Sequence, residues 1–224
     1  MTGTSLSSTK AEIVTAAERL FALHGIDGVS LRQIGAAAGA GNNSVVQYHF
    51  GSKDRLIDAI IEYRLPALHA RRTQLLERHR AGDLRSLLKC QALAILEQGE
   101  QPDSHYLSFI ATLRQQGHQE LLDRLPEEVR ASLHDFHQRL GAHLPHLPEH
   151  LRAHRLARAM TLIVQTAADR ERARSLGRPV PPFGLELADL VDSLVGSLLA
   201  TPSPESLAPL AEDEAAGVAW PPFI

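Results

Sequence analysis

The sequence has a single cysteine, few aromatic residues and no long apolar run. Cys90 is the only cysteine among 224 residues, which excludes an intrachain disulfide and a zinc site built from cysteines. No segment approaches about 18 consecutive apolar residues, so no membrane-spanning helix is expected. Residues 1–10 are rich in Ser and Thr and lack the charged-then-apolar order of a signal peptide, so we expect a cytoplasmic protein.

The chain also lacks an excess of basic charge. Its formal net charge is −3, from 23 Lys and Arg against 26 Asp and Glu, so bulk charge does not attract it to nucleic acid. Most of the acidic surplus lies in residues 201–224, which hold four acidic residues, several prolines and no Lys or Arg. We expect this segment to be a poorly ordered acidic tail and residues 1–8 to be a flexible N-terminus. A DNA-binding unit would have to act through a few well-placed groups.

Strand signals are missing, and the pattern predicts an all-α protein. Sustained alternation is absent, whereas the helix-forming residues Leu, Ala, Arg, Glu and Gln are abundant. Apolar residues at helical spacing, separated by Gly, Pro and capping residues, predict about nine helices. Asp83 and Asp103 are the expected caps of two of them, and Pro66 should interrupt and kink the long fourth helix. Seven of the predicted helices cover residues 9–24, 53–80, 84–98, 104–117, 126–144, 148–176 and 184–200.

The N-terminal part of the chain carries the signals of a helix-turn-helix. Ser30 and Gln33 form a capping box that begins a second helix. A glycine-containing turn follows, then a third helix that ends near Phe50, and Ser52 caps the fourth. Two short helices separated by a tight turn and supported by a longer helix are typical of a helix-turn-helix, in which the second helix of the pair enters the major groove.

The side chains of this segment are suited to reading DNA. Asn and Gln present a donor and an acceptor together, which match N6 and N7 of adenine, while a Tyr hydroxyl or a Lys at a helix start can hold a phosphate. Capping or turn roles for part of 42–44, packing for Tyr48 and a solvated position for Lys53 remain open alternatives. The predicted DNA-contacting residues are Ser30, Arg32, Gln33, Asn42, Asn43, Ser44, Gln47, Tyr48, His49 and Lys53.

Two runs of this segment resemble the N-terminal domain of the TetR/AcrR family of transcriptional regulators. They are Leu31-Arg-Gln-Ile-Gly-Ala-Ala-Ala-Gly39 and Tyr48-His-Phe-Gly-Ser-Lys-Asp-Arg-Leu56. The resemblance covers about residues 9–65, and the rest of the chain matches the family only in outline. The stretch from Gly39 to the aromatic residue that closes the third helix is one residue longer than is common in the family. Base contacts are therefore not transferred residue by residue within it.

The resemblance implies a division of the chain and a set of partners. Residues 9–65 would bind double-stranded operator DNA, and residues 66–200 would form a helical regulatory and dimerisation domain. The last two long helices would pair with those of a second subunit in a four-helix bundle, forming a homodimer. The residues predicted for this interface are Leu156, Ile163, Leu187, Val191, Leu194 and Leu198. For any one of them, packing within the chain is an equal alternative.

The resemblance also implies a pocket for a small-molecule effector among the middle helices. Ordinary core packing is the alternative role for each candidate taken alone. The sequence does not identify the effector. The candidate wall residues are Cys90, Leu93, Tyr106, Phe109, Leu113, Phe136, His137, Met160 and Gln165.

The histidines between positions 134 and 154 suggest a second function. His134 and His137 are spaced i and i+3, and His150 and His154 are spaced i and i+4, so each pair can bind a metal ion from one helix face. No carboxylate-containing metal signature accompanies them, and a solvated, pH-sensitive face is the competing interpretation. A nucleophile motif and a phosphate-binding loop are also missing, so we assign no catalytic residue, metal ion or cofactor.

The sequence thus favours an effector-responsive DNA-binding homodimer, with repression as the favoured mode of action. The alternative is a homodimeric metal- or small-molecule-binding helical module that does not recognise an operator.

Overall fold

The computed structural model describes residues 8–39, 45–116 and 127–208, and this part of the chain consists of helices and short turns without a strand. The prediction of an all-α protein is confirmed, and the seven ranges predicted above agree with the observed bounds to within two residues. Residues 204–208 are also helical. The helices are α1 (Ser8–His24), α2 (Leu31–Ala37), α3 (Val45–Phe50), α4 (Lys53–Arg78), α5 (Leu84–Gly99), α6 (Tyr106–Gln115), α7 (Glu127–Ala142), α8 (Glu149–Ser175) and α9 (Phe183–Leu199).

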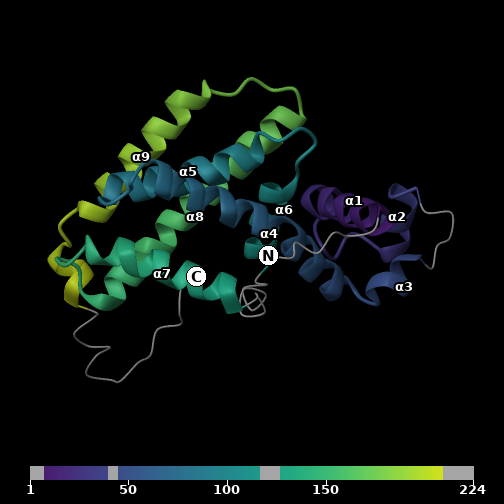
Figure 1. The fold of residues 1–224 in the computed structure, drawn as a ribbon, viewed down its shortest axis with the longest axis horizontal. Coiled ribbons are helices and arrows are strands. Elements are labelled where there is room, and N and C mark those ends of the chain that lie inside the picture. The colour runs from purple at the N-terminus through teal and green to yellow at the C-terminus, as the bar shows by residue number, and fades with distance from the viewer. Residues whose placement is uncertain (1–7, 40–44, 117–126, 209–224) are drawn as a thin grey trace.

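Helices α1, α2 and α3 gather at one end of the molecule, and α5, α7, α8 and α9 form the other end (Figure 1). At the smaller end, Phe21 of α1, Ile34 of α2 and Val46 of α3 are fully buried. Gly35 allows α2 and α3 to approach closely, because a Cβ atom at this position would lie 3.3 Å from Cγ2 of Val46. The two short helices are therefore held together by direct contact.

The predicted start of α2 is confirmed in atomic detail. The Ser30 hydroxyl accepts a hydrogen bond from the backbone N–H of Gln33 at 3.3 Å, and the Gln33 side chain accepts one from the backbone N–H of Ser30 at 2.8 Å. This reciprocal capping box satisfies two backbone donors that a helix leaves free at its start.

Helix α4 connects the two ends of the molecule as one helix of 26 residues. The sequence predicted an interruption at Pro66, but the helix continues on both sides of this residue. Close to its middle it pairs with α1 through Arg64 and Glu18, and further along Arg71 pairs with Glu97 of α5 at 2.6 Å. The domain boundary predicted near residue 65 therefore falls inside a continuous helix.

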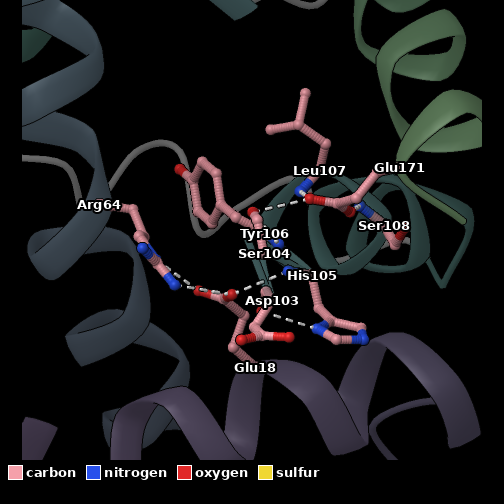
Figure 2. A network of polar contacts seen from close by, with 9 residues as sticks. All are labelled: Glu18, Arg64, Asp103, Ser104, His105, Tyr106, Leu107, Ser108 and Glu171. Carbon is pink, nitrogen blue, oxygen red and sulfur yellow. Dashed lines mark hydrogen bonds and ion pairs between the residues drawn. The ribbon is translucent and has the colours of Figure 1, made fainter. Parts of the chain in front are cut away.

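The N-terminus of α6 is capped by carboxylates from distant helices. Asp103 was the expected cap, but its backbone is left-handed with φ of +57°, and the helix begins only after His105, which makes no side-chain capping bond. Instead, Glu171 of α8 accepts a hydrogen bond from the backbone N–H of Ser108 at 2.8 Å, and Glu18 of α1 accepts one from that of His105 at 3.1 Å (Figure 2). The prediction for Asp103 is wrong because tertiary contacts supply the acceptors that a local side chain usually provides.

We expect Glu171→Gln to lower the free energy of unfolding by about 1–3 kcal/mol. The buried Glu171 carboxylate also accepts a hydrogen bond from the Ser104 hydroxyl at 2.8 Å, and an amide would offer one acceptor oxygen in place of two while adding donors that face other donors. Urea denaturation measures the change. The control is Glu62→Gln on the exposed face of α4, for which we expect less than about 0.5 kcal/mol. Equal denaturation midpoints for the two variants would contradict the capping role.

Candidate nucleic-acid interface

The outer face of α3 presents polar side chains to solvent. The burial of Val46 fixes the rotation of α3, so the two residues that follow it point outward. Gln47 is exposed and Tyr48 is 84% exposed. Helix α3, to which both belong, lies at the end of the molecule opposite α9 (Figure 1). Both side chains are accessible for contact with DNA. The base-reading candidates Asn42, Asn43 and Ser44 lie outside the described residues.

The candidates at the start of α2 are exposed, but some of their hydrogen-bonding groups already have partners within the helix. Ser30 and Gln33 bond to each other in the capping box, so the carbonyl oxygen of Gln33 already has partners and its amide NH₂ is the group left for a phosphate. Arg32 is exposed beside them. His49 is half-buried, with its ring 5.1 Å from that of Tyr48 and 6.3 Å from that of Phe50, and it supports the aromatic end of α3.

Lys53 has a structural role at the start of α4. Its ammonium nitrogen lies 2.9 Å from the backbone oxygen of Ile26 and 3.5 Å from that of Asp27, so it holds the turn between α1 and α2 against α4. An ammonium group has three N–H donors, and a third donor is left for a phosphate. The contact of Lys53 with DNA stays a prediction, while the solvated position considered above does not describe this half-buried side chain.

A partly buried ion pair connects this end of the molecule to the larger helical part. Nε and Nη2 of Arg64 in α4 lie 2.7 and 3.0 Å from the two carboxylate oxygens of Glu18 in α1, and one of these oxygens also accepts the backbone N–H of His105 before α6 (Figure 2). Phe21 of α1 stacks on Phe109 of α6 with ring centroids 6.1 Å apart. Helices α1, α4 and α6 therefore form one connected unit.

Sequence reasoning did not identify Glu18 or Arg64 as functional residues. A signal was available for Glu18, since it lies four residues after the buried Val14 and three before the buried Phe21, on the apolar face of α1. A charged residue at such a position requires a partner inside the fold. Which residue provides that partner depends on how α4 crosses α1.

A small cavity of about 40 Å³ lies between α4, α5 and α7. Its lining residues are Leu65, Leu68, His69 and Arg72 of α4, Gln91, Ala94 and Ile95 of α5, and Val129 and Leu133 of α7. None of the nine residues predicted for an effector pocket lines this cavity. Arg72 and Gln91, the two buried polar residues in the lining, were not identified from the sequence.

The predicted pocket residues are not brought together in one place. His137 borders an open cleft between α7 and α8, Gln165 borders another between α6 and α8, and Leu93 is half-buried against the core. The other six are packed in the main apolar core, because helical spacing marks a core residue and a pocket residue in the same way. These six are Cys90, Tyr106, Phe109, Leu113, Phe136 and Met160.

The predicted dimer-interface residues also lie inside the chain. All six (Leu156, Ile163, Leu187, Val191, Leu194 and Leu198) are 8% exposed or less. The reason is that α8 packs on α5 and α6 while α9 packs on α5, so the apolar stripes of both helices are used within one chain. The leucines that these helices turn outward are Leu162 of α8, 44% exposed, and Leu185 and Leu199 of α9, 61% and 50% exposed.

The histidines considered for a metal ion are divided between α7, which carries His134 and His137, and α8, which carries His150 and His154. Burial lowers the pKa of His137, whose Nδ1 lies 2.8 Å from the backbone oxygen of Leu133. Within the described ranges, no group of three or more His, Cys, Asp or Glu side chains is placed to hold a metal ion.

Among the described residues, no helix combines the length and apolarity that crossing a membrane requires.

A helix-turn-helix with an exposed polar second helix defines a DNA-binding protein, and comparison with known proteins identifies its family. Residues 13–60 match the model of bacterial regulatory proteins of the tetR family, and residues 88–200 match that of the tetracyclin repressor-like C-terminal domain. The chain therefore belongs to the TetR family and is a transcriptional regulator rather than an enzyme. The resemblance found in the sequence is confirmed.

Solved structures share this fold. A transcriptional regulator from Rhodococcus sp. Rha1 aligns with 21% identity over 86% of this chain and 99% of its own, with a TM-score of 0.57. NalD of Pseudomonas aeruginosa, the secondary repressor of the MexAB-OprM multidrug efflux pump, aligns with 23% identity over 85% of this chain and 98% of its own, with a TM-score of 0.51. No curated protein matches the chain. At these identities the similarity shows a common fold.

Substitutions at Gln47 and Lys53 are expected to have different effects on DNA binding. If Gln47 reads a base, Gln47→Ala costs about 1–3 kcal/mol at one base pair of each half-site and relaxes the preference there. Lys53→Met should weaken binding to all sequences about equally and reduce the slope of log affinity against log salt by about one unit per subunit. Affinities for a set of single-base operator variants at several salt concentrations measure both effects.

The matched control for these variants is Gln101→Ala, in the turn between α5 and α6 and outside the helix-turn-helix. A uniform loss of affinity across all sequences for Gln47→Ala would show that Gln47 does not read a base.

Proposed function

We propose that the protein binds a palindromic operator as a homodimer, represses transcription, and is released by a small molecule that enters the cavity between α4, α5 and α7. The observation that supports this most directly is the course of α4. This helix begins at Lys53 beside the helix-turn-helix and supplies four residues to the cavity lining, without a break between the two. A change in the position of α4 at the cavity therefore moves the reading helix.

The ion pair of Glu18 and Arg64 supports the same mechanism. Because it joins α1 to α4 and to the start of α6, the helix-turn-helix follows α4 instead of moving freely beside it. In a dimer, the two reading helices must enter major grooves about one helical turn, or 34–36 Å, apart. A ligand that shifts α4 in each subunit changes this separation, and a coupling of about 1–3 kcal/mol is ordinary for such an effect.

The outward leucines of α8 and α9 are the proposed contact between subunits. Exposed large apolar side chains on two adjacent helices favour association with a second copy, in which a two-fold axis brings the same surface of each subunit together. Leu162, Leu185 and Leu199 replace the six buried residues as the candidate interface. The buried residues still matter for the dimer, since they hold α8 and α9 in place.

We expect the double variant Leu162→Glu/Leu185→Glu to sediment as a monomer at micromolar concentration, because two copies of each carboxylate would be placed in an apolar interface. Its operator affinity should fall, since one half-site binds much less tightly than two. Sedimentation velocity measures the oligomeric state. The control is Leu23→Glu, at an exposed leucine of α1, which should leave the oligomeric state unchanged. A double variant that remains dimeric would place the interface elsewhere.

Selection of bound fragments from random DNA tests operator recognition. We expect an enriched motif with two-fold symmetry and half-sites about one helical turn apart. With the selected site placed over a promoter, adding the protein should reduce transcription in a purified system. An enriched motif without symmetry would contradict binding as a symmetric dimer, and increased transcription would contradict repression.

A further inference from the structure

The cavity between α4, α5 and α7 contains a buried cation without an acidic partner. Arg72 is only 5% exposed, and none of the ion pairs of the described residues involves it. Its Nη2 donates a hydrogen bond to the Ser132 hydroxyl at 2.9 Å and lies 3.0 Å from Nδ1 of His69, whereas its Nε is buried without a hydrogen-bond partner. A buried guanidinium is normally paired with a carboxylate, so this arrangement is incomplete.

The surroundings of Arg72 do not neutralise it. Burial lowers the pKa of His69 and the charge of Arg72 lowers it further, so at neutral pH this imidazole is uncharged and can accept the hydrogen bond. The Phe136 ring lies 5.1 Å from the guanidinium carbon and offers only the weak attraction of an aromatic face. At longer range Asp135 attracts the guanidinium and Arg139 repels it. Asp135 is exposed and forms no ion pair with Arg72, so no carboxylate of the described residues contacts the guanidinium at the cavity.

A second unsatisfied group faces the same cavity from α5. Gln91 is 9% exposed, and its side-chain oxygen is buried without a partner. Buried polar groups without a hydrogen bond are uncommon in folded proteins, and two of them in the wall of one cavity indicate a missing ligand. The Gln91 amide can turn either its oxygen or its NH₂ group towards that ligand. Apart from His69, the remaining lining is apolar, from Leu65, Leu68, Ala94, Ile95, Val129 and Leu133.

We propose that this cavity binds the carboxylate of an apolar organic acid, an inference that depends on the proposed effector function. The planar guanidinium of Arg72 pairs with a carboxylate through parallel hydrogen bonds, and the Gln91 NH₂ group adds another donor. A carboxylate carries one negative charge and balances one guanidinium, whereas a phosphate dianion would need a second cation that this wall does not contain. The apolar lining accepts the hydrocarbon part of the acid.

The size of the cavity links this ligand to the movement of α4. Its volume of about 40 Å³ holds a few water molecules, while ligand pockets usually measure about 300–1,000 Å³. A carboxylate head can enter, but a hydrocarbon chain requires α4 to move away from α5 or α7. Binding of the acid is therefore coupled to the displacement that would change the separation of the reading helices.

The test uses the full-length protein and probes that differ only in the head group, a charged carboxylate or a neutral amide. Octanoate and octanamide have the same chain length, and calorimetry at pH 7 measures the affinity of each. We expect octanoate to bind about 10- to 100-fold more tightly than octanamide, the usual effect of a hydrogen-bonded charge in a buried site. Equal affinities, a preference for octyl phosphate over octanoate, or no binding by butanoate, octanoate and dodecanoate would each overturn the proposal.

Variants of Arg72 separate a ligand-binding role from a purely structural one. We expect Arg72→Met to remove the preference for octanoate over octanamide without lowering the melting temperature, since it removes an unpaired buried charge. Arg78→Met, at an exposed arginine of the same helix, should keep the preference. A lower melting temperature with an unchanged preference would show that Arg72 is structural. Should Arg72→Met fail to fold, Gln91→Met is expected to weaken octanoate binding, and unchanged binding would count against the proposal.

Operator binding on the same preparations distinguishes failure of the proposed ligand from failure of the proposed regulatory function. We expect octanoate to weaken binding to the selected operator, and saturating operator to weaken octanoate binding by the same factor. Normal operator selection without octanoate binding would overturn only the assignment of the ligand. Failure of operator selection with intact octanoate binding would overturn only the proposed regulatory function.

Discussion

The Glu18 carboxylate holds together three helices that are distant in the chain. It accepts hydrogen bonds from Arg64 of α4 and from the backbone that begins α6, while itself belonging to α1 (Figure 2). Burying a carboxylate is costly unless its oxygens are satisfied, so the two elements are constrained to meet α1 at this point. The orientation of the helix-turn-helix relative to the regulatory helices depends on this contact, and the proposed transmission through α4 depends on that orientation.

Arg64 and Arg72 lie on the same helix but in opposite electrostatic situations. Arg64 has a bidentate carboxylate partner, whereas Arg72 has only neutral acceptors and an aromatic ring. They are eight residues apart, or about 12 Å along the helix axis. The charge nearer the DNA-binding end is satisfied by Glu18, whereas Nε of the one at the cavity has no hydrogen-bond partner, and this difference underlies the proposed response of α4 to a ligand. A ligand that supplies the missing negative charge acts on the element that positions the reading helix.

Most predictions that rest on local sequence signals agree with the structure. The capping box of Ser30 and Gln33 and the helical spacing of apolar residues depend on neighbours a few positions away, and the structure has these features where they were predicted. The cap predicted at Asp103 is wrong, because the backbone N–H groups at the start of α6 donate to Glu18 and Glu171 instead. These two residues lie 85 and 68 positions from Asp103 in the chain. Sequence periodicity contains no information about such distant acceptors.

The sequence by itself determined the all-α fold, the helix-turn-helix and the family, since each of these depends on local spacing or on motifs of adjacent residues. Only the tertiary structure decided which apolar residues face inward. Leu194 and Leu185 lie on the same helix, yet one is in the core and the other in solvent because α9 turns a single face towards α5. The tertiary structure likewise decided that Arg72 and Gln91 meet at a cavity, because the way α4 crosses α5 is set by the packing of the whole core.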